Sequence, residues 1–210
     1  MNITSNAVSP TNTQPIAFSI AFSSDVLGFT LSSLVISGGT GGFFTAVSAR
    51  LFTVSVTPSA PSVTVTVSVP AGAAVDAIGN ANLPAQLSVV YNAAAPTAVL
   101  TTTALSPSGT LPIPVLITFN EAVKGFTAAG LQVTGGSVQG AITGGPTAFL
   151  ANILPNSTFV TVSVRVRAHV ATDAAGNQNV ASSFLTVQHG SLDSVLSWVS
   201  DCERCAAARR

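Results

Sequence analysis

The sequence repeats itself at an interval of 97 residues, and this repeat limits the possible folds more than any single motif does. The offset relates Asp76 to Asp173 and needs no gap from about residue 4 to about residue 90. The other matched pairs are turn or core residue types: Ser9-Pro10 with Ser106-Pro107, Pro15-Ile16 with Pro112-Ile113, Phe22 with Phe119, Gly28-Phe29 with Gly125-Phe126, Leu34 with Leu131, Gly38-Gly39 with Gly135-Gly136, Phe52 with Phe149, and Pro58 with Pro155. We therefore expect two copies of one module at residues 1–95 and 96–190, followed by a C-terminal tail at 191–210.

Valine alternates with serine or threonine in both copies, which is the pattern of a half-buried strand. The run at 62–69 places four valines on one face, and the run at 160–167 does the same. Arg165 and Arg167 then point outward, where we expect them to discourage edge-to-edge pairing. Residues 97–105, 114–119, 130–135 and 182–188 read as further strands. About seven short strands in some 95 residues without a helical pattern predict an all-β fold of two tandem antiparallel β-sandwiches.

The expected core is aromatic and lacks disulfides. Both cysteines, Cys202 and Cys205, lie in the tail, so the modules depend on burial and β hydrogen bonding. Each module supplies three phenylalanines to its core, and burying one contributes roughly 1.5–3 kcal/mol. They are Phe22, Phe29 and Phe52 in the first copy and Phe119, Phe126 and Phe149 in the second.

The charge balance argues against several classes of partner. Only 7% of residues are charged, and seven basic residues balance seven acidic ones. Without a basic surplus, the sequence gives no electrostatic reason to expect nucleic acid or anionic membrane as a partner. The mean hydropathy of +0.58 is high, but no run of about 18 apolar residues predicts a membrane span.

Two longer stretches, ITFNEAVKGFTAAGLQVTGGSV and VTVSVRVRAHVATDAAGNQN, resemble the bacterial Ig-like repeat of large surface proteins. The resemblance covers residues 1–190 and implies an Ig-like sandwich in each module. It also implies a location at the cell surface or outside the cell, with neighbouring Ig-like repeats as partners. The N-terminus MNITSNAVSP lacks the features of a signal peptide, which leaves either a cytosolic chain or a fragment of a longer secreted protein. With the resemblance, we expect a segment of a longer array or an incomplete gene model.

The motifs VDAIGN (75–80) and TDAAGN (172–177) suggest either a structured turn or a calcium site. As a turn, the aspartate accepts backbone N–H bonds and the glycine supplies a positive φ. As a calcium site, Asp173 and Asn177 would supply oxygen ligands, joined by Glu121 if the fold brings it near. Module 1 has Asp25 close to the position of Glu121. Calcium requires six to eight oxygens, so we favour the turn and expect no cofactor.

Catalysis has little support in the sequence. No motif places a base beside a nucleophile. His169 corresponds to Gly72 in the first copy, so the histidine is not intrinsic to the module. We therefore predict no catalytic residues and no enzymatic activity.

The tail differs in composition from the modules. Leu192, Val195, Leu196 and Val199 form a helical stripe, so we expect a short helix or an irregular end. The single Cys202-x-x-Cys205 pair lacks a second pair for zinc.

These observations favour a non-enzymatic structural or adhesive spacer of a cell-surface or secreted multi-repeat protein. The alternative is an accessory module of a larger extracellular enzyme that binds carbohydrate or protein.

Overall fold

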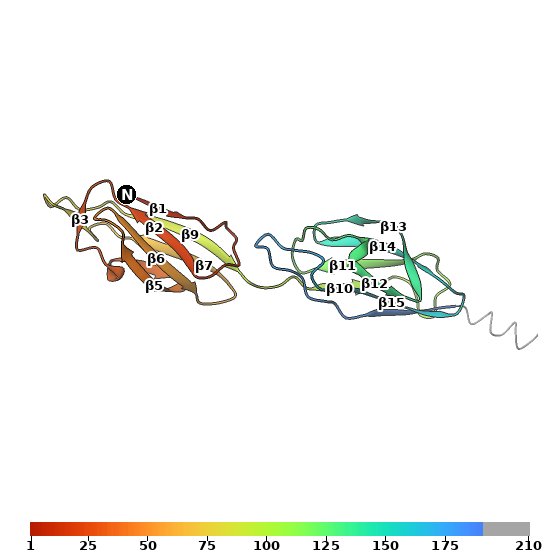
Figure 1. Cartoon of the computed structure of the whole chain (residues 1–210). Coiled ribbons are helices and arrows are strands. Elements are labelled where there is room, and N and C mark those ends of the chain that lie inside the picture. The colour runs from red at the N-terminus through yellow and green to blue at the C-terminus, as the bar shows by residue number, and fades with distance from the viewer. Residues whose placement is uncertain (191–210) are drawn as a thin grey trace, which may run out of the picture. The chain divides into compact units, whose positions relative to one another are not determined.

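Alternating strands pair into antiparallel sheets in both halves of the chain (Figure 1). A computed structural model describes residues 1–190, so the helix expected in the tail lies outside the described residues. One compact unit contains Met1–Ala94, and another contains Ala95–Asp173 and continues from Gln178. We call residues 1–95 module 1 and residues 96–190 module 2. Within residues 1–190, no helix is long and apolar enough to cross a membrane.

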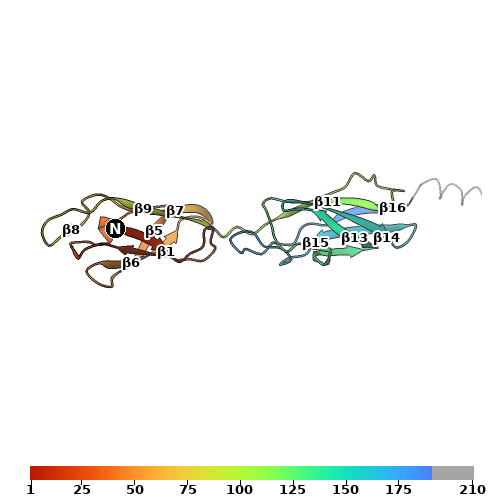
Figure 2. The same ribbon diagram turned by 90° about the horizontal axis from the view of Figure 1, so that it is seen from above.

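Module 1 has two sheets and one short strand pair. The first sheet has the order β1-β2-β6-β5 and the second β4-β7-β9, while β3 pairs with β8. Strands β7 and β9 lie side by side in both views (Figures 1 and 2). The bounds are β1 Asn2–Ser5, β2 Ile16–Ala21, β3 Val26–Leu27, β4 Val35–Ser37, β5 Gly39–Ala46, β6 Leu51–Pro58, β7 Ser62–Val69, β8 Val75–Asp76 and β9 Ala85–Asn92.

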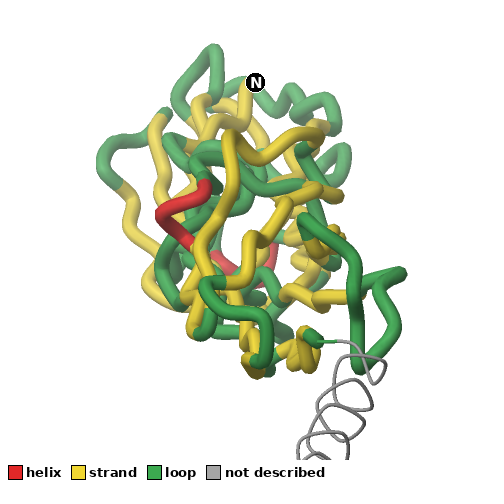
Figure 3. Tube along the Cα trace, turned by 90° about the vertical axis from the view of Figure 1, so that its right-hand side faces the viewer, coloured by secondary structure: helices red, strands yellow, loops and turns green. Residues whose placement is uncertain are grey.

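Module 2 repeats this arrangement with seven strands. Its sheets have the orders β10-β11-β14-β13 and β12-β15-β16, which match module 1 strand for strand. The bounds are β10 Ala98–Thr101, β11 Ile113–Phe119, β12 Leu131–Thr134, β13 Gly136–Gly144, β14 Ala148–Pro155, β15 Val160–Val166 and β16 Leu185–His189. The helical residues among 1–190 are the short 3-10 turns η1 (Leu31–Ser33) and η2 (Ala128–Gly130), drawn red in Figure 3. The predicted all-β fold is therefore confirmed.

In each module, the segment after the first strand runs parallel to the last strand: Thr11 pairs with Tyr91 of β9, and Ser108 pairs with His189 of β16. In module 1, Thr11 N–H donates to the Val90 oxygen at 3.0 Å, and Asn92 N–H donates to the Thr11 oxygen at 2.8 Å. In module 2, Ser108 bonds in the same way to Gln188 and Gly190. Because the two segments point the same way, the chain enters each module at one end and leaves it at the other.

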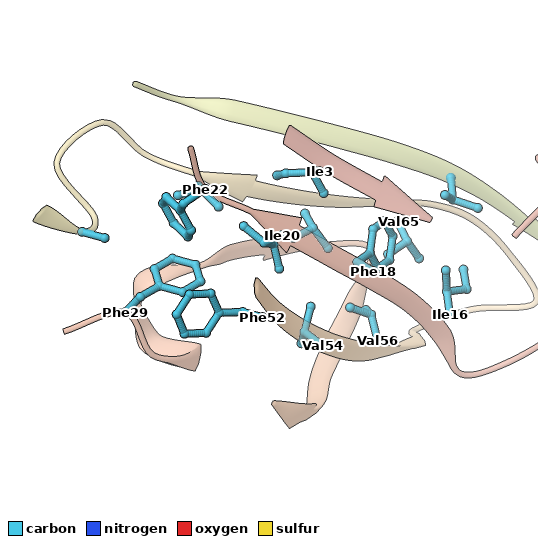
Figure 4. Close-up of a cluster of buried hydrophobic side chains, with 14 of the residues drawn as sticks. Ile3, Ile16, Phe18, Ile20, Phe22, Phe29, Phe52, Val54, Val56 and Val65 are labelled. Carbon is cyan, nitrogen blue, oxygen red and sulfur yellow. The ribbon is translucent and has the colours of Figure 1, made fainter. Parts of the chain in front are cut away.

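The alternating valines and the phenylalanines form the core, as predicted. Val65, Val67 and Val69 are each at most 1% exposed. Figure 4 shows the rings of Phe22, Phe29 and Phe52 gathered at one end of the core of module 1. Their centroids lie 4.8–5.8 Å apart in edge-on contacts, a favourable arrangement for aromatic quadrupoles. Phe119, Phe126 and Phe149 form the same trio in module 2.

The repeat interval changes in the last strand. Val65 pairs with Val89, whereas its counterpart Val162 pairs with Val187, so the offset becomes 98 residues. The expected gapless register to about residue 90 is therefore wrong. The turn at Asn82 and Asn179 keeps the 97-residue offset, so the extra residue lies in the loop between Val180 and β16.

The predicted role of Arg165 as a guard of a sheet edge is also wrong. Strand β15 is the central strand of its sheet, so it has no free edge to protect. The Arg165 Nε instead donates to the Gln132 Oε1 at 2.8 Å, and its guanidinium lies 4.6 Å from the centre of the Phe184 ring. Arg167 follows the strand and is exposed.

Candidate functional site

The motif at 75–80 forms the turn that the sequence predicts. The Asp76 carboxylate accepts hydrogen bonds from the backbone N–H of Ile78 at 3.0 Å and of Asn80 at 2.8 Å. It also accepts one from the Asn80 side-chain amide at 2.8 Å. Gly79 has φ +92°, which favours glycine. The Asn80 bonds, aided by the backbone of Ile78 and Gly79, lower the pKa of Asp76 against a smaller opposing effect of burial.

The same turn in module 2 is more deeply buried. Gly176 has φ +91°, matching Gly79, and Asp173 is 4% exposed. Glu121 is half-buried. Asp173, Asn177 and Glu121 all have interaction partners in the structure.

Calcium binding at Asp173, Asn177 and Glu121, the alternative that the sequence analysis did not favour, stays an untested hypothesis. Within residues 1–190, no three Asp, Glu, His or Cys residues are grouped so that they could hold a metal ion. In module 1, N–H donors already occupy the Asp76 oxygens, and Asp25 pairs with Arg50 at 2.5 Å. A rise in melting temperature with calcium that Asp173→Asn abolishes would establish the ion site.

A second asparagine, overlooked in the sequence analysis, organises each turn. The Asn179 side chain is fully buried and accepts hydrogen bonds from the N–H groups of Val170 and Ala171, each at 2.9 Å. Its amide nitrogen donates to the Arg167 and Val180 oxygens, each at 2.8 Å. Asn82 in module 1 makes three matching bonds, to Ala74 N–H and the Pro70 and Leu83 oxygens. The available signal was the recurrence of Asn82 as Asn179 at the repeat interval.

His169 has a structural role in the exposed turn after β15. It is the one non-glycine residue among 1–190 with positive φ, at +61°, and Gly72 holds the same place in module 1 at +73°. Both residues donate a backbone hydrogen bond to the matching asparagine, His169 to the Asn179 oxygen and Gly72 to the Asn82 oxygen. The other histidine, His189, ends β16.

A small pocket lies beside the acidic turn of module 1. Its volume is about 190 Å³, and Phe22, Ser23, Asp76, Asn82 and Leu83 are among its lining residues. Sites for drug-sized ligands usually measure about 300–1,000 Å³. The pocket is therefore smaller than a typical site for a drug-sized ligand.

The two modules, each built from two antiparallel sheets in the same strand order, define a tandem β-sandwich protein. The sequence model of the family described as bacterial Ig-like domain matches residues 1–93 and again residues 92–189. The chain belongs to this family, which confirms the resemblance seen in its motifs. A search of curated proteins finds no match.

Proposed function

We propose that the chain is a non-enzymatic spacer or adhesive segment of a cell-surface or secreted multi-repeat protein. Family membership supports this proposal, because bacterial Ig-like domains are generally non-catalytic and typically occur in extracellular proteins. The observation that carries it is the parallel pairing of the first and last segments of each module. A module that is entered at one end and left at the other extends a chain when it is repeated.

The same pairing suits a module that bears load. Pulling on the two ends of module 1 drives Thr11 and Tyr91 past each other along their strands. The bonds of Thr11 to the Val90 oxygen and the Asn92 N–H then have to break together rather than one after another. Ser108 provides the same pair of bonds in module 2.

Stretching a single chain tests the proposal. We expect two separate unfolding events, each releasing roughly 300 Å of chain, since an extended residue spans about 3.3–3.6 Å. A chain that extends without resisting force would contradict a load-bearing role. Hydrolytic activity of the purified chain would contradict the non-enzymatic assignment.

A second function, glycan or protein binding by an accessory module, is favoured by the outer face of module 2. Arg165 and Gln132 form a bonded pair of planar polar groups beside Phe184, which is 47% exposed. An exposed ring next to hydrogen-bonding planar groups suits a sugar ring or a peptide side chain. Saturable binding on a glycan array that Phe184→Ala abolishes would favour this function over a plain spacer.

A further inference from the structure

We propose that the pocket of module 1 binds an extended Ala-Pro-Thr peptide like the one at residues 95–97 that leads into module 2. Equivalent positions in the two modules support this assignment. It deepens the proposed spacer function, because it names a contact that would stiffen an array of modules. The biological purpose of this contact rests on that proposed function.

In module 2, the chain itself occupies the position equivalent to this pocket. Pro96 is buried, and its oxygen accepts a hydrogen bond from the Val180 N–H at 3.1 Å. The next residue, Thr97, donates its N–H to the Asn120 Oδ1 at 2.7 Å and accepts one from the Asn120 N–H at 3.0 Å. Three hydrogen bonds and a buried ring thus hold this dipeptide against module 2.

The pocket of module 1 is built from the equivalent residues. Ser23 corresponds to Asn120 and Leu83 to Val180 at the repeat interval of 97 residues, and both line the pocket. Met1, which corresponds to Ala98, lines it as well. A segment placed like Pro96 and Thr97 would therefore enter this pocket, with its proline oxygen facing the Leu83 N–H.

Three exposed positions that belong to the pocket lining or lie within two residues of it carry larger apolar side chains in module 1 than in module 2. Leu27, Ile78 and Leu83 are 63%, 86% and 79% exposed. At the first two of these positions module 2 has Lys124 and Ala175. Large apolar side chains left in water favour a contact that removes them from it. An uncharged peptide of alanine, proline and threonine suits this surface, because Asp76 is the only titratable side chain among the pocket residues and it is already bonded to Asn80.

The occupant should be pre-extended and short. Proline fixes φ near −65° and lacks an N–H, so it enters an apolar pocket without leaving a donor unpaired and with little conformational entropy to lose. The pocket volume of about 190 Å³ leaves room for only a small segment.

The test places this peptide ahead of Met1 in the full chain. One version carries Asn-Ala-Ala-Ala-Pro-Thr, copied from residues 92–97, and the control carries six residues of alternating Gly and Ser. Amide hydrogen exchange is followed by NMR at Leu83, with Val180 as an internal reference. We expect exchange at Leu83 to slow at least tenfold with the copied segment and to stay unchanged with the Gly-Ser segment. Ser23→Asn, which supplies the amide found at Asn120, should slow the exchange further.

Equal exchange rates at Leu83 in the two extended chains, with Val180 still protected, would overturn the proposal. Slowing by both extensions would also overturn it, because the pocket would then show no preference for the Ala-Pro-Thr sequence. Neither result would affect the spacer function, which the stretching experiment tests separately.

Discussion

At the scale of single residues, one buried side chain can organise a whole loop. Asn179 holds the backbone at four points along residues 167–180. Each bond contributes about 0.5–1.5 kcal/mol, and a buried group that loses its partner costs about 1–3 kcal/mol.

We expect Asn179→Ala to destabilise module 2 by about 2–4 kcal/mol, because it removes all four bonds from a buried site. Asn82→Ala should cost less, since Asn82 makes three bonds and is only half-buried. Urea denaturation of both variants measures the difference. Equal losses would show that burial does not set the strength of this interaction.

His169 and Gly72 offer a matched pair for measuring backbone strain. A left-handed conformation costs a side-chain-bearing residue roughly 1–2 kcal/mol. Glycine avoids this steric cost but loses more conformational entropy on folding, so the net gain is smaller. We expect His169→Gly to stabilise module 2 by about 0.5–1 kcal/mol and Gly72→Ala to destabilise module 1 by about 1 kcal/mol. A Cβ at Gly72 would have open space around it, so a thermal unfolding measurement there reports on the backbone alone.

At the scale of elements, the acidic turn of module 1 should make that module sensitive to acid. The pKa of Asp76 is lower in the folded chain than its usual value because of its bonds to Asn80. The stabilisation is present above the unfolded pKa of about 3.9 and is lost as the pH falls through the lower folded pKa. Asp76→Asn should therefore reduce the loss of stability that module 1 shows as the pH becomes acidic. An unchanged loss of stability would contradict the role of this carboxylate.

Strands with strict alternation were predictable from the sequence. The run at 62–69 became β7 with the same bounds, and its valines face the core as expected. Period-two burial is a local property, so the sequence alone reveals it. The acidic turns were predictable for the same reason, because Asp76 bonds mainly to residues within the next four positions.

Other elements depended on distant partners and were missed. The strand β13 contains three glycines and little alternation, and its pairing with β14 defines it as a strand. Asn179 bonds to residues as far back as Arg167, which no local motif reveals. The change of offset to 98 in β16 is visible only from its pairing with β15.

At the scale of the whole molecule, duplication preserved the architecture and allowed the surfaces to diverge. Strand orders and phenylalanine trios match between the modules. The outer sheet face differs, since Arg165 replaces Ser68 and Gln132 replaces Val35. A spacer needs the shared core, whereas its exposed faces are free to acquire separate contacts.

Each module should resist force mainly through its parallel first and last segments. Thr11→Pro tests this directly, because proline lacks the N–H that Thr11 donates to the Val90 oxygen. In single-chain stretching, we predict that one of the two unfolding events moves to lower force, while the event of module 2, with Ser108 intact, stays unchanged. Ser108→Pro should produce the converse result. Two unchanged events in the Thr11→Pro chain would contradict the claim.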